Sequence, residues 1–248
     1  MDDPKFFNDK LLVLKLTERN PLYKKLVDKY EVREYVKEKI GKEYLIPLIG
    51  IYSSPSEVNY DKLPDKFALK PTAGSQHNII CTDKSTLDWN KESKKLRKWL
   101  KLDFYRRTRE WPYKNLKNRF VIEEFIEDSK GNTADYKFWC FNGKPVTVQV
   151  HTDRFNDHKK GMFDIEFNNQ LLDYGEKTID FKIDKPENYE KMVELARILS
   201  EGFPFVRIDL YNLDGRIFFG EMTFYPANCN GKIRPLKYEQ LFGEMILR

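Results

Sequence analysis

The sequence predicts an α+β fold in which antiparallel sheets and helices are mixed along the chain. Helical and strand patterns follow one another without the regular strand–helix–strand order of a doubly wound parallel sheet. Several predicted strand pairs are joined by short turns, which fit antiparallel pairing. The chain has 248 residues, 40% of them hydrophobic and 33% charged, so it can bury an ordinary core without disulfides or metals.

Neither a membrane span nor a secretion signal is evident in the sequence. The longest apolar stretch, residues 44–52, contains Pro47 and Gly50 and is far shorter than the roughly 20 residues that cross a bilayer. The N-terminus is acidic, unlike a signal peptide. The cysteines are widely spaced and odd in number, which argues against a disulfide framework or a zinc site. We therefore expect a cytoplasmic protein with no membrane span and with reduced cysteines.

The net charge of +5 favours an anionic ligand. Basic and acidic residues are interleaved along the chain, and no dense basic block stands out. Nucleotides and acidic sugars explain this charge as well as nucleic acid does, and we expect no nucleic-acid partner.

The first half of the chain is predicted to hold two helices and several short strands. Apolar residues recur near a 3.6-residue spacing over 20–40, and Gly41 is placed to end that helix. A second helix is predicted over 85–103, with Leu102 among its inward residues and its lysines interpreted as a solvated face. Strands are predicted over 44–52, 66–70, 77–81 and 120–126, with a turn-prone loop after the second of them.

The second half is predicted to hold two β-hairpins and one helix. Asn142-Gly143 is a strong turn signal, because type I′ turns need positive φ, and it joins strands over 135–141 and 146–151. A helix is predicted over 187–201, with Gly202 as its stop. The last hairpin has predicted strands over 205–211 and 217–224.

The last hairpin carries the strongest chemical signal. Arg207 and Asp209 alternate with aliphatic residues on its first strand, and Glu221 and Thr223 alternate on its second. If the turn has three residues, Arg207 faces Glu221 and Asp209 lies diagonally beside it, so one face gathers two carboxylates, a hydroxyl and a guanidinium. A two-residue turn at Asp214-Gly215 would instead put Glu221 on the opposite face.

Two converging carboxylates are the ligands that Mg²⁺ uses when it keeps waters and shares its other positions with phosphates. The hairpin therefore predicts a metal site at Asp209 and Glu221, with Thr223 as a further oxygen. The alternative is a surface salt bridge on an ordinary sheet.

Motifs spread along the chain resemble those of the ATP-grasp superfamily. From about Asp28 to the end, the chain is similar to the TupA-like branch, which is associated with capsular and teichuronopeptide-type polysaccharides. The whole-length pattern is specific, although each piece alone is weak. The pieces are Asp28-Lys29-x-x-x-Arg33, Lys70 before a small-residue loop, Glu123-Glu124-Phe125-Ile126, Asp135-Tyr136-Lys137-Phe138, Arg207-x-Asp209 and Gly220-Glu221-x-Thr223.

The resemblance implies an ATP-grasp fold of two α+β lobes, with the nucleotide held between antiparallel sheets and a shortened N-terminal lobe. It implies a short N-terminal helical region over 1–60, a small lobe over 61–130, and a C-terminal lobe over 131–248 that carries the metal hairpin. The short N-terminal region is consistent with a chain that is one domain of a larger capsule-biosynthesis protein.

The resemblance also implies ATP and Mg²⁺ as ligands. Basic side chains and the loop 72–77 would contact the nucleotide phosphates, and the segment 123–126 would lie against the adenine, with an acid just after it for the ribose. The implied nucleotide-binding residues are Lys29, Arg33, Lys70, Ser75, Glu123, Glu124, Phe125, Ile126, Asp128 and Lys137.

The densest polar run covers residues 151–160. Arg154 is suited to bidentate recognition of a carboxylate or phosphate, and His158 and Lys159 can add charge or proton transfer. We predict that this run, together with Arg207, stabilises the transferred phosphoryl group or holds the acceptor acid. A solvated loop is the alternative for the run.

The implied chemistry activates a carboxylate as an acyl phosphate, which an amine then attacks. The leading hypothesis is a carboxylate–amine ligase acting on a uronic acid or an amino-acid-bearing polysaccharide precursor. The alternatives are a kinase that phosphorylates a sugar hydroxyl and a non-catalytic nucleotide- or glycan-binding module. A glycosyltransferase is disfavoured because the acids do not form a DxD motif.

Overall fold

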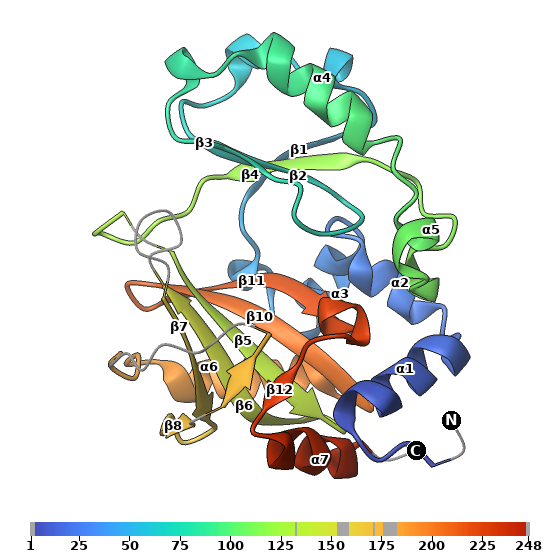
Figure 1. Ribbon diagram of the computed structural model, residues 1–248. Helices are drawn as coiled ribbons and strands as arrows, with labels where there is room; N and C mark the ends of the chain where they lie inside the picture. Colours follow the sequence, from blue (N-terminus) through green and yellow to red (C-terminus); the bar gives the residue numbers. More distant parts are fainter. Residues whose placement is uncertain (1–2, 132, 153–158, 171, 176–182, 247–248) are drawn as a thin grey trace. The chain divides into compact units, whose positions relative to one another are not determined.

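The computed structural model describes residues 3–131, 133–152, 159–170, 172–175 and 183–246 (Figure 1). The chain divides into two compact units. The larger unit consists of residues 1–18, 38–44 and 127–248, and the smaller unit consists of residues 19–37 and 45–126. The three regions predicted from the sequence have other boundaries and stay a prediction. No described helix is long and apolar enough to cross a bilayer.

The smaller unit is built on a four-stranded antiparallel sheet in the order β1-β4-β2-β3. Helix α4 (Trp89–Trp99) packs on it through Leu96, which is fully buried together with Phe67, Leu69 and Phe120 of the strands. The predicted strands of this region are confirmed with shifted ends: β1 Leu48–Tyr52, β2 Phe67–Pro71, β3 Ile79–Cys81 and β4 Phe120–Glu124.

Two helix predictions in the smaller unit need correction. The single helix expected over 20–40 is two helices, because Asp28 has an extended backbone and its carboxylate accepts hydrogen bonds from the amides of Tyr30 and Glu31. Helix α4 is shorter than expected, and Leu102 lies outside it with 42% of its surface exposed. The other helical elements around this unit are α2 Leu22–Val27, α3 Val32–Lys39, α5 Phe104–Thr108, η2 Pro55–Glu57, η3 Tyr60–Lys62, η4 Lys84–Thr86 and η5 Trp111–Tyr113.

The larger unit is built on a six-stranded antiparallel sheet in the order β11-β10-β5-β6-β7-β8. The turn predicted at Asn142-Gly143 is confirmed, since both residues have positive φ (50° and 76°). A separate two-stranded sheet pairs β9 (Asp173–Tyr174) with β12 (Ile233–Arg234). The six strands are β5 Ala134–Phe141, β6 Lys144–Thr152, β7 Lys159–Asp164, β8 Asn169–Gln170, β10 Phe205–Leu213 and β11 Arg216–Thr223.

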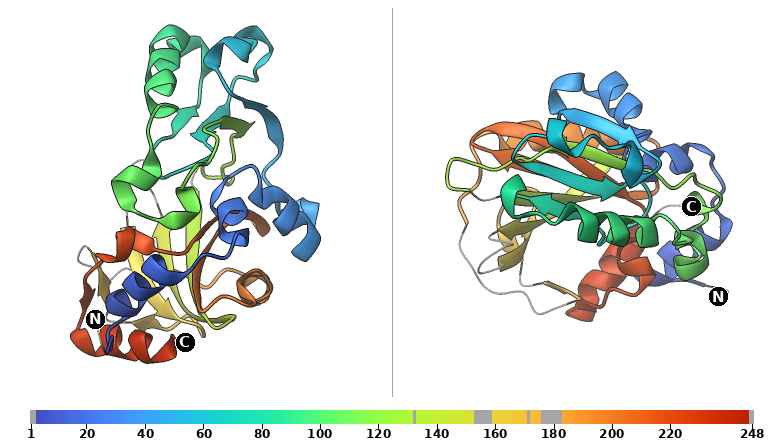
Figure 2. Two further views of the ribbon diagram at one scale, coloured as in Figure 1. Left: turned by 90° about the vertical axis from the view of Figure 1, so that its right-hand side faces the viewer. Right: turned by 90° about the horizontal axis from the view of Figure 1, so that it is seen from above.

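Helices pack on both faces of the six-stranded sheet. Neighbouring residues of a strand point to opposite faces, and Phe138 contacts Tyr189 of α6 (Tyr189–Ser200), whereas Trp139 stacks on Phe7 of α1 (Phe7–Thr17). Helix α7 (Leu236–Met245) joins α1 on that second face through Phe242 (Figures 1 and 2). The apolar spacing predicted no helix over 7–17, although the family resemblance implied a helical region over 1–60. Short 3₁₀ helices lie at η1 Lys42–Tyr44 and η6 Pro226–Cys229.

The last hairpin does not have the register of the three-residue turn, but Asp209 and Glu221 still lie on the same face of the sheet. The turn has two residues, because Leu213 pairs with Arg216 across Asp214 and Gly215, both at positive φ. A β-bulge then shifts the register by one residue at Gly220, so that Asp209 pairs directly with Glu221. The bulge therefore returns both carboxylates to one face of the sheet, where a regular two-residue hairpin would have separated them.

The bulge favours a glycine for a steric reason. A Cβ atom on Gly220 would lie 3.0 Å from the carbonyl oxygen of Asp209 and 3.2 Å from the Tyr211 ring. Those contacts are tighter than ordinary van der Waals packing, so a larger residue would force its neighbours beside Asp209 to shift by a few tenths of an ångström.

Candidate nucleotide and metal site

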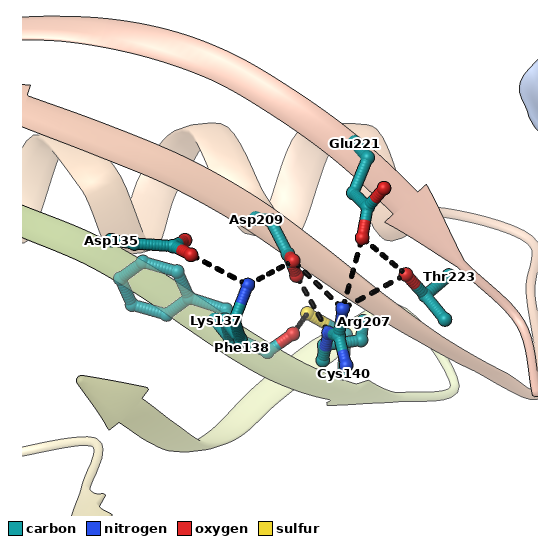
Figure 3. A network of polar contacts seen from close by, with 8 residues as sticks. All are labelled: Asp135, Lys137, Phe138, Cys140, Arg207, Asp209, Glu221 and Thr223. Carbon is teal, nitrogen blue, oxygen red and sulfur yellow. Dashed lines mark hydrogen bonds and ion pairs between the residues drawn. The ribbon is translucent and has the colours of Figure 1, made fainter. Parts of the chain in front are cut away.

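Four polar side chains of the last hairpin meet on one face of the six-stranded sheet (Figure 3). Arg207 holds Asp209 with two nitrogens, Nε to Oδ1 at 2.7 Å and Nη2 to Oδ2 at 2.8 Å. The same Nη2 donates to Glu221 Oε1 and to the Thr223 hydroxyl, each at 3.1 Å, and that hydroxyl donates to Glu221 Oε1 at 3.3 Å. The structure thus brings together the four hairpin residues that the sequence singled out.

Strand β5 adds a second cation to this group. Lys137 pairs in register with Asp209, and its Nζ lies 2.5 Å from Asp209 Oδ2 and 2.7 Å from Asp135 Oδ2. We call Asp135, Lys137, Arg207, Asp209, Glu221 and Thr223 the sheet cluster. With three carboxylates and two cations, its formal charge is −1.

The charges in the sheet cluster stabilise one another despite their burial. Burial alone would raise the pKa of Asp209, but Arg207 and Lys137 bring that pKa below its ordinary value of 3.8. Burial alone would lower the pKa of Lys137, but Asp135 and Asp209 raise it above its ordinary value. Asp209 therefore stays ionised at neutral pH, as a metal ligand must be.

The remaining acceptor positions of the sheet cluster fit a magnesium ion. Of the four lone-pair sites of the Asp209 carboxylate, three accept hydrogen bonds, which leaves one on Oδ1. Glu221 Oε1 accepts two, and no described residue donates to Oε2. Since Mg²⁺ in phosphate-transfer sites takes one or two carboxylates and fills its other positions with water and phosphate, Asp209 and Glu221 are sufficient. The described residues contain no group of three or more acidic, His or Cys ligands.

The sequence patterns gave no role to two residues around the sheet cluster, Asp135 beside Lys137 and Tyr174 near Arg207. Asp135 was quoted as part of a motif without a role, although its alternation with Lys137 on one strand was the available signal. Tyr174 influences Arg207 electrostatically; burial raises the pKa of this tyrosine, and its hydroxyl has no hydrogen-bond partner in the described part of the chain. No sequence signal could have found Tyr174, because it lies in a two-residue strand.

The turn after β11 has an unusual backbone. Ala227, Asn228 and Cys229 all have positive φ (48°, 54° and 63°), a conformation that non-glycine residues seldom adopt in succession. The buried Lys15 of α1 donates a short hydrogen bond to the Asn228 side chain and fixes the turn in place. The chain thus holds a strained turn immediately after the carboxylate-bearing hairpin.

A second cluster of predicted residues forms in the smaller unit, which we call the Glu123 cluster. Glu123 Oε1 lies 3.0 Å from Arg33 Nη1, and its Oε2 lies 3.0 Å from Lys70 Nζ. Lys70 and Glu123 share a face because Lys70 pairs with Val121 on the neighbouring strand. With two cations and one carboxylate, the formal charge of the Glu123 cluster is +1.

The loop predicted to cover the phosphates is held by Lys29, another of the predicted nucleotide-binding residues. Lys29 Nζ donates to the Gly74 carbonyl at 2.6 Å, and the Lys29 amide donates to the carbonyl of Thr72. Gly74 has positive φ, and a Cβ there would overlap the Phe104 ring. Ser75 is exposed, and its carbonyl oxygen lies 2.8 Å from His77 Nδ1.

The segment predicted to lie against adenine begins at the end of β4. Glu124 is exposed and its amide donates to the Pro47 carbonyl, whereas Phe125 and Ile126 are partly buried. Asp128 belongs to the larger unit, where its carboxylate accepts a hydrogen bond from the Lys130 amide.

Two of the predicted catalytic residues, Arg154 and His158, lie outside the described residues. Lys159 begins β7, is partly exposed and pairs with Thr152 of β6. Of the predicted catalytic set, the described structure therefore joins Arg207 alone to the sheet cluster.

The structure resembles solved proteins of the ATP-grasp fold. It matches the ADP complex of N5-carboxyaminoimidazole ribonucleotide synthetase with a TM-score of 0.53 at 13% identity, covering 96% of this chain and 56% of that chain. The D-alanine–D-alanine ligase from Helicobacter pylori matches with a TM-score of 0.47 at 14% identity, covering 90% of this chain and 61% of that chain. The D-alanine–D-alanine ligase from Bacillus anthracis complexed with ATP matches with a TM-score of 0.45 at 14% identity, covering 81% of this chain and 54% of that chain. The predicted α+β class and ATP-grasp fold are thereby confirmed.

A match to a family model assigns the chain to one family within this fold. Residues 9–247 match the model of the TupA-like ATPgrasp family, and the chain belongs to this family. A comparison with curated protein sequences found no match. The chain spans 54 to 61% of the length of the three solved structures named above.

Proposed function

We propose that the protein is a Mg-ATP-dependent carboxylate–amine ligase that forms an amide through an acyl phosphate, and that it works in the cytoplasm. The proposed acceptor is a uronic acid or an amino-acid-bearing precursor of a capsular polysaccharide. Membership of the TupA-like ATP-grasp family supports the nucleotide chemistry. The observation that carries the proposal is the sheet cluster, in which two carboxylates with open acceptor positions lie beside a fixed guanidinium.

In this proposal Asp209 and Glu221 hold magnesium, with the Thr223 hydroxyl orienting Glu221. The metal ion would neutralise charge on the transferred phosphoryl group and orient it. Arg207 is fixed by three side chains and has hydrogen bonds to both metal carboxylates, so it is already oriented and needs little rearrangement to stabilise charge that develops nearby. Lys137 keeps Asp209 ionised and positioned.

The residues of the smaller unit are proposed to bind the nucleotide. Arg33 and Lys70 would contact phosphate oxygens, and Glu123 would position both cations, since each of its oxygens already accepts from one of them. Lys29 would set the loop that carries Ser75 through its hydrogen bond to Gly74. The remaining proposed contacts are those of Glu124, Phe125 and Ile126 with the adenine and of Asp128 with the ribose.

Turnover of ATP with a panel of uronic acids and amines tests this function, with mass detection of the product. An amide together with ADP and phosphate is the expected result. Replacing both metal carboxylates, Asp209→Asn with Glu221→Gln, should reduce turnover by about 100-fold or more, because several kcal/mol of charge stabilisation are lost. The matched control, Glu190→Gln with Glu194→Gln, removes two exposed carboxylates from α6 and should leave turnover unchanged.

The same assay separates the alternatives. A stable phosphoester instead of an amide would mean that the protein is a kinase. ATP binding without any product over the whole panel would favour a non-catalytic module. Unchanged turnover in the Asp209→Asn, Glu221→Gln variant would refute the metal assignment.

A further inference from the structure

The smaller unit carries a concentration of positive charge that the nucleotide site does not use. Residues 91–119 contain twelve Lys and Arg residues against three Asp and Glu residues, in a chain whose total net charge is only +5. The rest of the chain is therefore net acidic. Our expectation that no dense basic block exists was wrong for this segment, because the count over the whole chain concealed it.

The basic side chains of this segment point to solvent. Lys91, Lys94 and Lys98 recur at spacings of three and four residues and form one stripe along α4, while the opposite side of the helix is buried through Leu96. We call the exposed cations of this segment the basic surface. They are Lys91, Lys94, Arg97, Lys98, Lys101, Arg106, Arg107, Arg109, Lys114 and Lys117.

Acidic side chains do little to neutralise the basic surface. Glu92 and Glu110 are buried, and Glu92 pairs with Lys95. Asp103 is exposed, but it caps α5 and pairs with Arg106 at 3.2 Å. No ion pair involves the other nine cations in the described part of the chain, so their charge is available to a partner.

Aromatic and apolar side chains lie beside cations of the smaller unit, both in this segment and in residues 19–24. Trp111 lies under Arg19 and Lys24, whose charged groups are 5.8 and 4.9 Å from the ring centre, and Lys114 lies 5.6 Å from the Tyr105 ring. Leu102, 42% exposed, follows Lys101 at the end of α4. Amphipathic aromatic rings beside basic residues are typical of surfaces that sit at the headgroup level of a bilayer.

We propose that the basic surface binds the protein peripherally to anionic phospholipid membranes. Clustered Lys and Arg are attracted to the negative surface potential of such a membrane without inserting. The apolar side of α4 is occupied by the core of its own unit, so the helix contributes charge and no inserted face.

The shape of the basic surface favours a membrane over a single extended polyanion or a small anion. A polymer chain is usually held in a groove with stacking platforms, whereas the stripe that this surface forms on α4 is the exposed outer side of that helix. The cavity at its edge, lined by residues including His77, Trp99 and Phe104, measures about 10 Å³. That volume admits at most one water molecule, and no sugar ring or phosphate group.

Vesicle cosedimentation of the full chain tests the proposal. Vesicles of phosphatidylcholine with phosphatidylglycerol should bind the protein, vesicles of phosphatidylcholine alone should not, and added salt should release it. Replacing Lys94, Lys98 and Arg107 by Gln should lower the partition coefficient by about 100-fold, since each basic residue near the surface contributes about fivefold.

A matched variant controls for net charge. Replacing Lys130, Lys144 and Lys237 by Gln removes the same three charges from exposed positions of the larger unit and should leave binding unchanged. Equal losses in the two variants would overturn the assignment to this surface. Binding to a soluble polyuronate or to DNA without binding to phosphatidylglycerol vesicles would overturn the choice of a membrane. The salt dependence of the unaltered protein gives a second measurement that needs no variant.

Discussion

The two clusters of charged side chains differ in the sign of their excess charge. In the sheet cluster, three carboxylates share two cations, whereas in the Glu123 cluster Arg33 and Lys70 share one carboxylate. Both clusters are largely buried, so the excess charge in each is poorly screened by water. An excess of negative charge suits a cation and an excess of positive charge suits phosphate. The proposed function uses this difference: metal would bind in the larger unit and nucleotide phosphates in the smaller one.

The largest expected effect comes from removing the cation that joins most of the sheet cluster. Arg207→Met should lower the free energy of unfolding by about 3–5 kcal/mol, because three carboxylates would keep Lys137 as their one cation. Urea denaturation followed by circular dichroism measures the loss. The exposed Arg197→Met on α6 is the control and should change stability by less than about 0.5 kcal/mol. If Arg207→Met lost as little stability as the control, the three carboxylates would not need the Arg207 guanidinium to remain buried in the folded protein.

Glu123→Gln tests the opposite cluster, and a smaller loss of about 2 kcal/mol is expected. Two cations would lose their counter-charge, yet the amide oxygen can still accept a hydrogen bond from one of them. The same denaturation assay applies. A loss equal to that of Arg207→Met would remove the energetic distinction between the clusters.

Gly220→Ala should have a more modest effect of about 1 kcal/mol, because the added methyl group presses on the Asp209 carbonyl and the Tyr211 ring. It should also weaken the magnesium dependence of nucleotide binding, since the bulge sets the position of Glu221. Calorimetric titration with and without MgCl₂ measures this. A variant with full stability and full magnesium dependence would show that the bulge does not need glycine.

The smallest expected effect is a change in the free energy of unfolding with pH, which the sheet cluster should cause only in acid and in strongly alkaline solution. The pKa of Asp209 is lower in the folded than in the unfolded state, so its contribution to stability is present above pH 3.8 and is lost as the pH falls through the folded value. The pKa of Lys137 is raised, so its contribution is lost only in strongly alkaline solution. The stability difference between the unaltered protein and Asp209→Asn should therefore shrink below pH 3.8. A difference that stays constant down to pH 2 would contradict the lowered pKa.

The sequence identified which residues of the last hairpin come together, but it did not predict the strand register that brings them together. Alternation along two strands identified Arg207, Asp209, Glu221 and Thr223, and these four side chains do meet. The two-residue turn would have separated them, and only the bulge at Gly220 restores the shared face. A bulge follows from the pairing of two whole strands, which a local pattern does not contain.

The Glu123 cluster could not be assembled from local patterns either. Arg33 and Glu123 are 90 positions apart, and their contact depends on how α3 packs beside β4. The break at Asp28 was missed because the apolar spacing continues across it, although an acid that caps the next helix was a usable signal. Helix α1 was missed because its own apolar residues are spread around all sides of the helix, so they show no helical periodicity, and because no side chain caps its start.

Magnesium-dependent nucleotide binding tests the central claim most directly. Calorimetric titration with ADP should show that MgCl₂ tightens binding to the unaltered protein by about tenfold or more, or at least 1.4 kcal/mol. The variant with Asp209→Asn and Glu221→Gln should keep the magnesium-free affinity and lose the tightening. A variant that binds Mg-ADP as tightly as the unaltered protein would contradict a metal site in the sheet cluster.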